Sequence, residues 1–263
     1  MADPNPPADG APDPVTLGEL AADLRALAAA STGPGGRAIV GLCGPPGTGK
    51  STTAFRLRDA LGVERAVVVQ LDGFHLATPV IADTPLAARR GAIDTFDPGG
   101  FASLVERVRA NDEPVVYAPS FERDLEEPIN ASVAVRPEHD VVIVEGNYLL
   151  ADGAEWARVR SCLDEVWYLH TAPGLRLPRL VQRHVASGKS PAAATAWVAD
   201  SDEVNARLIA STADRADRFL DVSALPPPDA TADTHRGPLC LRGVRQVGVQ
   251  DLSDQIGVPD EQC

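Results

Sequence analysis

A glycine-rich stretch that ends in lysine and serine has the clearest chemistry in this sequence. Residues 44–51 read Gly-Pro-Pro-Gly-Thr-Gly-Lys-Ser and fit the phosphate-binding pattern G-x-x-x-x-G-K-[ST]. Glycines let a backbone wrap closely around phosphate oxygens, and the N–H groups that begin a helix attract anions. The residues expected to contact the phosphates are Gly44, Pro45, Pro46, Gly47, Thr48, Gly49, Lys50, Ser51 and Thr52.

The last residues of this loop have separate predicted roles. Lys50 should reach the β- and γ-phosphates of ATP, and the Ser51 hydroxyl should bind Mg²⁺. An ordinary glycine turn is the alternative, but the strand predicted before the loop and the helix predicted after it are the context that the motif requires. A dinucleotide site is disfavoured, because Thr52 stands where G-x-G-x-x-G needs its third glycine.

Two carboxylates follow predicted strands and are candidates for the chemistry beside the phosphates. Asp72 follows the apolar run 66–71, and Glu145 ends the run that begins at Val141. The carboxyl ends of parallel strands line the ligand crevice of an α/β sheet. Asp72 can accept the proton of an attacking hydroxyl or orient it, and Glu145 can lie beside Mg²⁺. A turn aspartate and a capping glutamate are the plain alternatives.

Cations gather in a segment that we expect to form a lid at about residues 174–190. Arg176, Arg179 and Arg183 are spaced by three and four and share one helical face. Lys189 follows them and, with Lys50, is one of only two lysines among 24 basic residues. We predict that Arg179 and Arg183 neutralise the transferring phosphoryl group, and that Arg176 and Lys189 contact the nucleotide. A solvated helix face is the alternative.

The elements that must position these residues are apolar strands that alternate with amphipathic helices. Strands are predicted at 38–43, 66–71, 114–117, 141–144, 165–169 and 218–222. Helices are predicted at 17–27, 54–61, 101–109, 175–186 and 192–210. Uninterrupted apolar strands between helices indicate an α/β fold with a parallel sheet that is covered on both faces.

Composition divides the 263 residues into three parts and limits the partners. We expect a disordered segment at 1–14, one domain at 15–222, and a linker and tail at 223–263. With 24 basic against 37 acidic residues the formal charge is −13, so neither nucleic acid nor a membrane is an expected partner. The sequence starts without a secretory pattern, and its four cysteines lack paired spacing. We therefore expect a cytoplasmic protein.

Several separate motifs lie within about residues 37–222, namely Asp72-Gly-Phe, Arg90-Gly-Ala-Ile-Asp-Thr-Phe-Asp97, Val116-Tyr117 and Glu145-Gly-Asn. Together they resemble the superfamily of uridine kinase, bacterial pantothenate kinase and phosphoribulokinase. The likeness is greatest to a bacterial group labelled uridine kinase-like or fructose-transport-associated kinases. The resemblance implies a three-layer P-loop kinase fold with a five-stranded, mainly parallel sheet and a helical lid. It also implies Asp72 as catalytic base, with Ser51 and Glu145 around Mg²⁺.

The same resemblance bears on the acceptor. Pantothenate kinases have a histidine two residues after the tyrosine that matches Tyr117, where this sequence has Pro119. Uridine kinases carry an arginine six residues after that tyrosine, and Arg123 fits. The acceptor-pocket candidates are Arg89, Arg90, Tyr117, Phe121 and Arg123, and packing or surface roles remain open for each.

The sequence therefore predicts a phosphotransferase that uses ATP and Mg²⁺ and moves the γ-phosphate to a hydroxyl of a small metabolite. A nucleoside such as uridine, a sugar or a pantothenate-like alcohol are the acceptors considered. A non-catalytic ATP-binding sensor is the alternative function. The choice between a monomer and a homodimer is left open.

Overall fold

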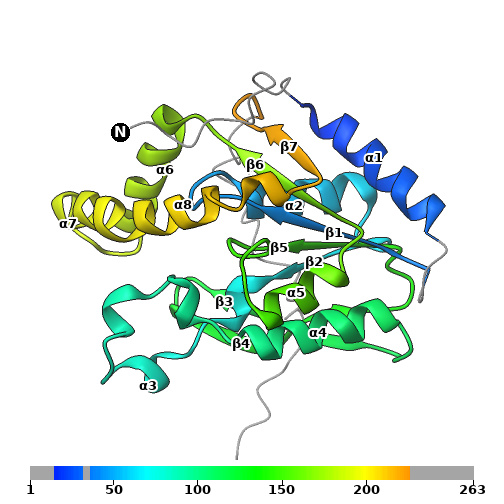
Figure 1. Cartoon of the computed structure of the whole chain (residues 1–263), viewed down its shortest axis with the longest axis horizontal. Helices are drawn as coiled ribbons and strands as arrows, with labels where there is room; N and C mark the ends of the chain where they lie inside the picture. Colours follow the sequence, from blue (N-terminus) through cyan, green and yellow to red (C-terminus); the bar gives the residue numbers. More distant parts are fainter. Residues whose placement is uncertain (1–14, 32–35, 226–263) are drawn as a thin grey trace, which may run out of the picture. The chain divides into compact units, whose positions relative to one another are not determined.

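The computed structural model describes residues 15–31 and 36–225. The segment expected to be disordered (1–14) lies outside the described residues, and so does the predicted linker and tail (223–263) except for residues 223–225. Five parallel strands form the main sheet in the order β2-β5-β1-β6-β7 (Figure 1). Their bounds are Ala38–Cys43 (β1), Ala66–Gln70 (β2), Val141–Glu145 (β5), Glu165–His170 (β6) and Arg218–Asp221 (β7).

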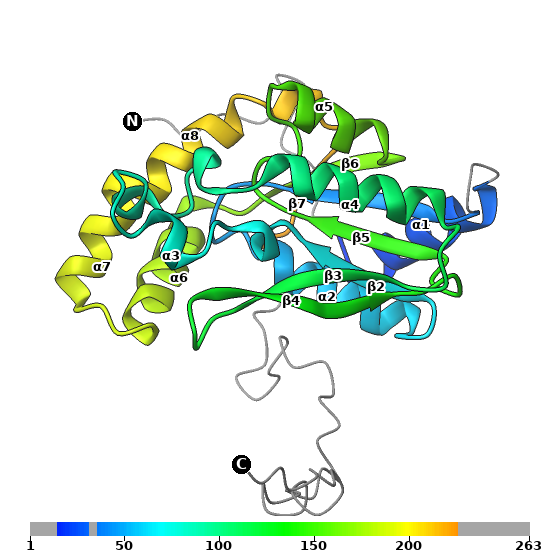
Figure 2. The ribbon, with the colours of Figure 1, turned by 90° about the horizontal axis from the view of Figure 1, so that it is seen from below.

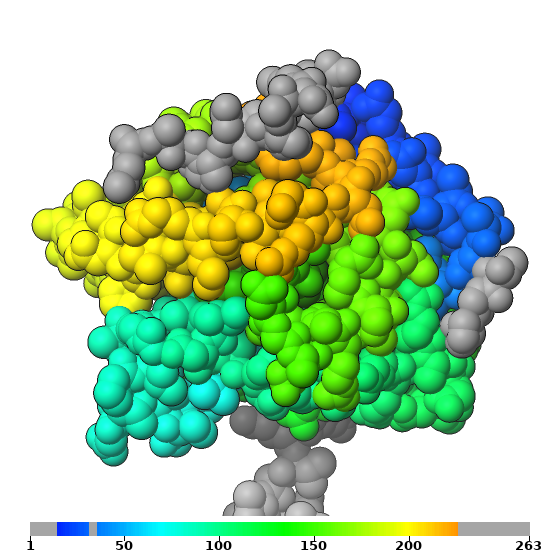
Figure 3. Space-filling view, viewed as in Figure 1, coloured from blue at the N-terminus to red at the C-terminus, as the bar shows by residue number. Residues whose placement is uncertain are grey.

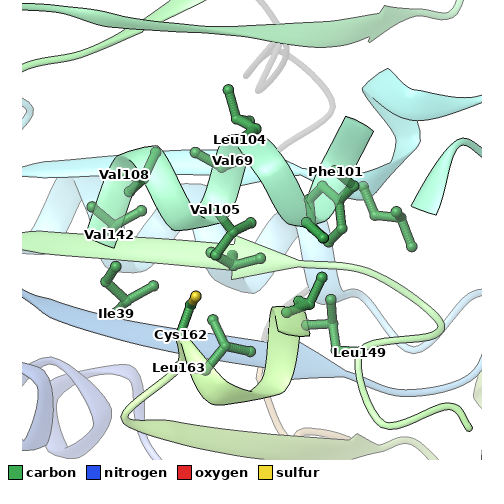
Figure 4. Close-up of a cluster of buried hydrophobic side chains, with 14 of the residues drawn as sticks. Ile39, Val69, Phe101, Leu104, Val105, Val108, Val142, Leu149, Cys162 and Leu163 are labelled. Atoms are coloured by element: carbon green, nitrogen blue, oxygen red, sulfur yellow. The ribbon is translucent and has the colours of Figure 1, made fainter. Parts of the chain in front are cut away.

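Helices cover both faces of this sheet, because successive side chains of each buried strand point to opposite sides. One face packs against α1 (Leu17–Ala30) and α2 (Lys50–Leu61). The other packs against α4 (Pro98–Ala110) and α5 (Ala154–Ser161), which lie side by side in Figure 2. Figure 4 shows this second core, in which strand residues such as Ile39, Val69 and Val142 meet helix residues such as Phe101 and Val105.

Three further substructures lie beyond the main sheet. The hairpin β3 (Val116–Glu122) and β4 (Glu127–Val135) is antiparallel. The chain between β2 and α4 forms short turns named η1 (Leu71–Phe74), α3 (Thr78–Ile81), η2 (Ala87–Arg89) and η3 (Ile93–Thr95). After β6 come α6 (Pro173–Ala186), α7 (Pro191–Trp197), the π-helical segment η4 (Val198–Asp202), α8 (Glu203–Ala210) and η5 (Ala213–Arg215).

The predicted fold class is confirmed, with differences in detail. The strand predicted at 114–117 is longer and pairs with β4 outside the main sheet. The helix predicted at 192–210 is α7 and α8 joined by the π-helical segment. Neither β4 nor α5 was predicted. Within the described part of the chain, every helix is too short or too polar to span a bilayer.

Candidate active site

The glycine-rich loop runs from the end of β1 to the start of α2, as predicted. Three of its glycines have positive φ, with values of 150° at Gly44, 82° at Gly47 and 90° at Gly49. A Cβ at Gly44 would lie 2.5 Å from the Leu169 carbonyl oxygen, so a larger residue would not fit there. Gly49 is the N-cap of α2 and offers no side chain to the first N–H groups of the helix. Those groups therefore remain for an anion, and the loop fits a phosphate.

Lys50 lies within this loop, with only 7% of its surface exposed. Its Nζ donates to the carbonyl oxygens of Gly44 at 2.8 Å and Pro45 at 3.1 Å. Burial lowers the pKa of Lys50, although the negative charge of Glu145 opposes that change. The ammonium group thus lies beside the backbone of the glycine-rich loop, where the motif predicts it.

Glu145 and Ser51 meet at the carboxyl ends of neighbouring strands. The Ser51 hydroxyl donates to Glu145 Oε1 at 2.9 Å. Gln70, the register partner of Glu145 across β2 and β5, donates its Nε2 to the same oxygen at 2.8 Å. Burial and the negative charge of Asp72 raise the pKa of Glu145, despite these donors and Lys50. No role for Gln70 was predicted from the sequence. The signal that could have revealed it is the position of this polar residue at the end of an apolar strand.

These oxygen atoms fit Mg²⁺. Within the described residues, no cluster of three or more His, Cys, Asp or Glu side chains could hold a metal ion. Mg²⁺ does not need such a cluster, since it commonly uses one or two carboxylates together with phosphate oxygens and water. Partly buried Ser51 and buried Glu145 offer hard oxygen ligands beside the loop, which is the donor set that this ion prefers.

Asp72 lies in η1, directly after β2. A Cβ at the next residue, Gly73, would lie 2.6 Å from the Pro119 carbonyl oxygen, so the turn packs closely against β3. Burial raises the pKa of Asp72, but the positive charges of four groups together outweigh it and lower the pKa overall. These groups are His75, Arg123, Lys50 and Arg183. They come from η1, the hairpin, the glycine-rich loop and α6, so several elements converge on one ionised carboxylate.

The lid cations have different environments. Arg176 is 2% exposed and donates to the Pro46 carbonyl oxygen at 3.2 Å and to Glu203 Oε1 at 2.6 Å. It therefore ties α6 to the loop and to α8. Arg183 is an exposed residue whose charge acts on Asp72.

Two further cations of the lid were predicted to act on phosphate. Arg179 is partly buried on α6. Lys189 follows α6 and lies with its Nζ 4.9 Å from the centre of the Trp197 ring. Their contacts with phosphate, like that of Arg176 with the nucleotide, stay predictions.

Part of the predicted acceptor pocket comes together. The Phe121 ring lies 5.1 Å from the His75 ring and 5.7 Å from the Arg90 guanidinium. Arg90 donates to Thr78 Oγ1 at 2.8 Å and to the Glu126 carbonyl oxygen at 2.6 Å, so it joins α3 to the hairpin turn.

Tyr117 and Arg89 lie apart from this group. Tyr117 is 56% exposed between the buried residues Val116 and Ala118, so its side chain points away from the packed face of β3. Arg89 is exposed and pairs with Asp94. The structure therefore places Phe121 beside His75 and Arg90, lets the charge of Arg123 act on Asp72, and leaves Tyr117 outside this group.

Comparison with known proteins places this site in a family. The chain matches no protein-family model. It is 38% identical over 145 residues to the ATP-dependent kinase-like protein notR' of Aspergillus versicolor. This match covers 52% of this chain and 84% of the relative. A "putative uridine kinase" of Schizosaccharomyces pombe is 35% identical, over 58% of this chain and 68% of the relative. The chain belongs to the uridine kinase-like family of P-loop kinases.

A solved structure supports this membership in the uridine kinase-like family. It is a "putative fructose transport system kinase" from Silicibacter sp. TM1040, 35% identical, with a TM-score of 0.69 over 78% of this chain and 98% of that one. The resemblance inferred from the motifs is therefore confirmed. The kinase-like relatives support an ATP-dependent phosphotransferase as the general class of the protein.

Proposed function

We propose that this protein is an ATP- and Mg²⁺-dependent kinase that transfers the γ-phosphate to a hydroxyl of a small metabolite. The observation that carries the proposal is the convergence on Asp72 of Lys50 from the loop, Arg183 from α6 and Arg123 from the hairpin. Phosphoryl transfer needs an acceptor-side carboxylate and cations around the transferring group at one place. A site for nucleotide binding alone would not need that carboxylate.

Each part of the site has a role in this reaction. The loop 44–52 and Lys50 would hold the phosphates, and Ser51 and Glu145 would hold Mg²⁺, which would neutralise phosphate charge. Asp72 accepts the proton of the acceptor hydroxyl or orients that hydroxyl. The hydroxyl oxygen bonds to the γ-phosphorus, and the bond from that phosphorus to the bridging oxygen of ADP breaks.

Cations of the lid balance the charge that moves in this step. Arg183 already acts on Asp72, and Arg179 lies one turn earlier on α6. Since the transferring group spreads negative charge over its oxygens, cations held in place beforehand stabilise it without further reorganisation. Positioning and charge neutralisation therefore supply most of the rate acceleration.

The acceptor belongs to the classes of nucleoside, sugar or pantothenate-like alcohol. His75 and Arg123, whose charges act on Asp72, combine with the Phe121 ring beside His75 to offer both aromatic surface and a cation. Aromatic faces suit planar or apolar groups, and an arginine suits acceptor oxygen atoms. This combination suits an amphipathic alcohol.

An acceptor screen tests the proposal. Purified protein with Mg²⁺ and ATP is offered uridine and other nucleosides, sugars, pantothenate and glycerate, and ADP release is followed together with the mass of the phosphorylated product. We expect ADP in proportion to one added alcohol, and no product in the Lys50→Ala variant. Nucleotide binding without acceptor-dependent ADP across the whole panel would favour the sensor instead.

A further inference from the structure

The first turn of α8 contacts parts of the molecule that lie far apart in sequence. We call residues 202–205 the α8 junction. Its polar side chains have partners in two different elements: Asp202 pairs with His184 of α6 at 2.7 Å, Glu203 with Arg176 of α6 at 2.6 Å, and Asn205 donates to the Gly91 carbonyl oxygen at 3.3 Å. Figure 3 shows the yellow-to-orange segment of α7 and α8 lying against the cyan-green segment that includes α3.

On the nucleotide side, the α8 junction reaches the glycine-rich loop through one guanidinium. Arg176 binds Glu203 with one nitrogen and the Pro46 carbonyl oxygen with another. The loop packs on α6 so closely that a Cβ at Gly47 would lie 2.7 Å from Leu180 Cγ. Because the Arg176 end of this charge pair is buried, breaking the pair is costly, and α8 is thereby tied to α6 and the loop.

On the acceptor side, the α8 junction holds one backbone carbonyl. The Gly91 carbonyl oxygen accepts hydrogen bonds from Asn205 and from the Tyr148 hydroxyl, the latter at 2.7 Å. Both donors are buried, with 7% and 2% of their surface exposed. Gly91 has a φ of 98°, a conformation that favours glycine. The direction of this carbonyl is therefore fixed by its own backbone and by two buried donors.

Hydrogen bonds continue from Gly91 to the turn that carries Asp72. The Gly91 N–H donates to Thr95 Oγ1 at 3.0 Å, and the Thr95 carbonyl accepts from the Leu76 N–H at 2.9 Å. The backbone of His75 forms an isolated antiparallel β-bridge with Phe96. The His75 Nδ1 lies 2.9 Å from the Asp72 carbonyl oxygen. The segment 91–97 is thus a direct mechanical support of the Asp72 turn.

We propose that the α8 junction couples nucleotide binding at the glycine-rich loop to the ordering of residues 91–97 and the Asp72 turn, with Asn205 as the positioning residue. The inference rests on the proposed function, because it explains how an ATP-bound loop prepares the acceptor side. Coupling between sites is a free energy carried by connected contacts. Here Arg176, Glu203 and Asn205 form the connection, and none of them has to touch the acceptor.

Hydrogen–deuterium exchange can test this coupling without knowledge of the acceptor. The probe is a non-hydrolysable ATP analogue with Mg²⁺, added to the full-length chain. In the wild type it should slow exchange in the loop, in α6 and in residues 91–97. Asn205–Gly91 is a single neutral hydrogen bond, so the nucleotide-dependent slowing of exchange at 91–97 should be at most about 12-fold.

Variants separate coupling from simple packing. Asn205→Ala should bring the ratio of the exchange rates at 91–97 without and with nucleotide close to one, while the loop remains protected. Glu203→Ala, on the less buried side of the α8 junction, should do the same and replaces Asn205→Ala if that variant does not fold. Tyr148→Phe should speed exchange at 91–97 with and without nucleotide and keep the ratio. Arg207→Ala, at an exposed position of α8, is the matched control and should behave as the wild type.

The outcomes distinguish this inference from the proposed function. If the analogue protects the loop and α6 but Asn205→Ala and Glu203→Ala retain the wild-type ratio at 91–97, the coupling is refuted and the kinase proposal stands. The absence of any nucleotide effect at 91–97 in the wild type would refute it as well. If the wild type does not bind the analogue at all, both proposals fail.

Discussion

Substituting Gly47 by alanine tests how closely α6 packs on the glycine-rich loop. The φ of 82° at Gly47 costs an alanine about 1–2 kcal/mol. The added Cβ would also lie 2.7 Å from Leu180 Cγ and 3.1 Å from the Arg176 carbonyl oxygen. Overpacking of this kind costs about 1–3 kcal/mol more. We therefore expect Gly47→Ala to lower the free energy of unfolding by about 2–5 kcal/mol.

A second glycine of the same loop provides the matched control. Gly49 has a similar φ of 90°, but a Cβ built there has no atom within 4 Å. Gly49→Ala should therefore cost only the backbone strain of about 1–2 kcal/mol. Urea denaturation of the nucleotide-free proteins measures both values. Equal losses in the two variants would show that α6 does not press on Gly47, and would refute the close packing of lid and loop.

Two further predictions concern Lys50 and Glu145. Lys50→Ala removes the ammonium group beside the loop and should weaken ATP binding by about 10- to 100-fold, the scale of a lost charge-assisted hydrogen bond, as measured by calorimetry. Unchanged affinity would contradict its role. Burial and the charge of Asp72 raise the pKa of Glu145, so its carboxylate takes up a proton at a higher pH than an ordinary glutamate. Because Mg²⁺ binds the ionised carboxylate, the affinity of the wild type for Mg²⁺-nucleotide should fall as the pH is lowered through that raised pKa. Glu145→Gln should bind Mg²⁺-nucleotide weakly and should not show this fall in affinity. Identical pH profiles for the two proteins would exclude Glu145 as a ligand.

Much of the fold followed from the sequence, because the strands β1, β2 and β5 of the main sheet are buried on both faces. Runs such as 38–43 and 141–144 contain only apolar residues or glycine, and a strand is the simplest structure for so short a run. The segment 127–135 gave no such signal. It begins Glu-Pro-Ile-Asn, and most of its residues remain exposed or partly exposed in β4. Its pairing with β3 depends on a partner that local pattern does not reveal.

The candidate site was predictable where a motif states the chemistry, as at Lys50, Ser51 and Glu145. Residues that act through hydrogen bonds to the backbone were not. Tyr148 and Asn205 converge on the Gly91 carbonyl from positions 57 and 114 residues away in sequence. Such a meeting is fixed by tertiary packing, and neither residue type signals it. Arg176 is a further case, since its spacing predicted a nucleotide contact, which stays a prediction, but did not reveal the bonds of its guanidinium to the Pro46 carbonyl oxygen and to Glu203.

The central claim is that Asp72 is the acceptor-side carboxylate of a kinase, and Asp72→Asn tests it most directly. The substitution keeps the size of the side chain and removes its ability to take a proton. Once an acceptor is known, steady-state turnover and ATP affinity are measured for the variant and the wild type. We expect unchanged ATP binding and a kcat lower by about 10²- to 10⁴-fold. Near-normal turnover of Asp72→Asn would contradict the account.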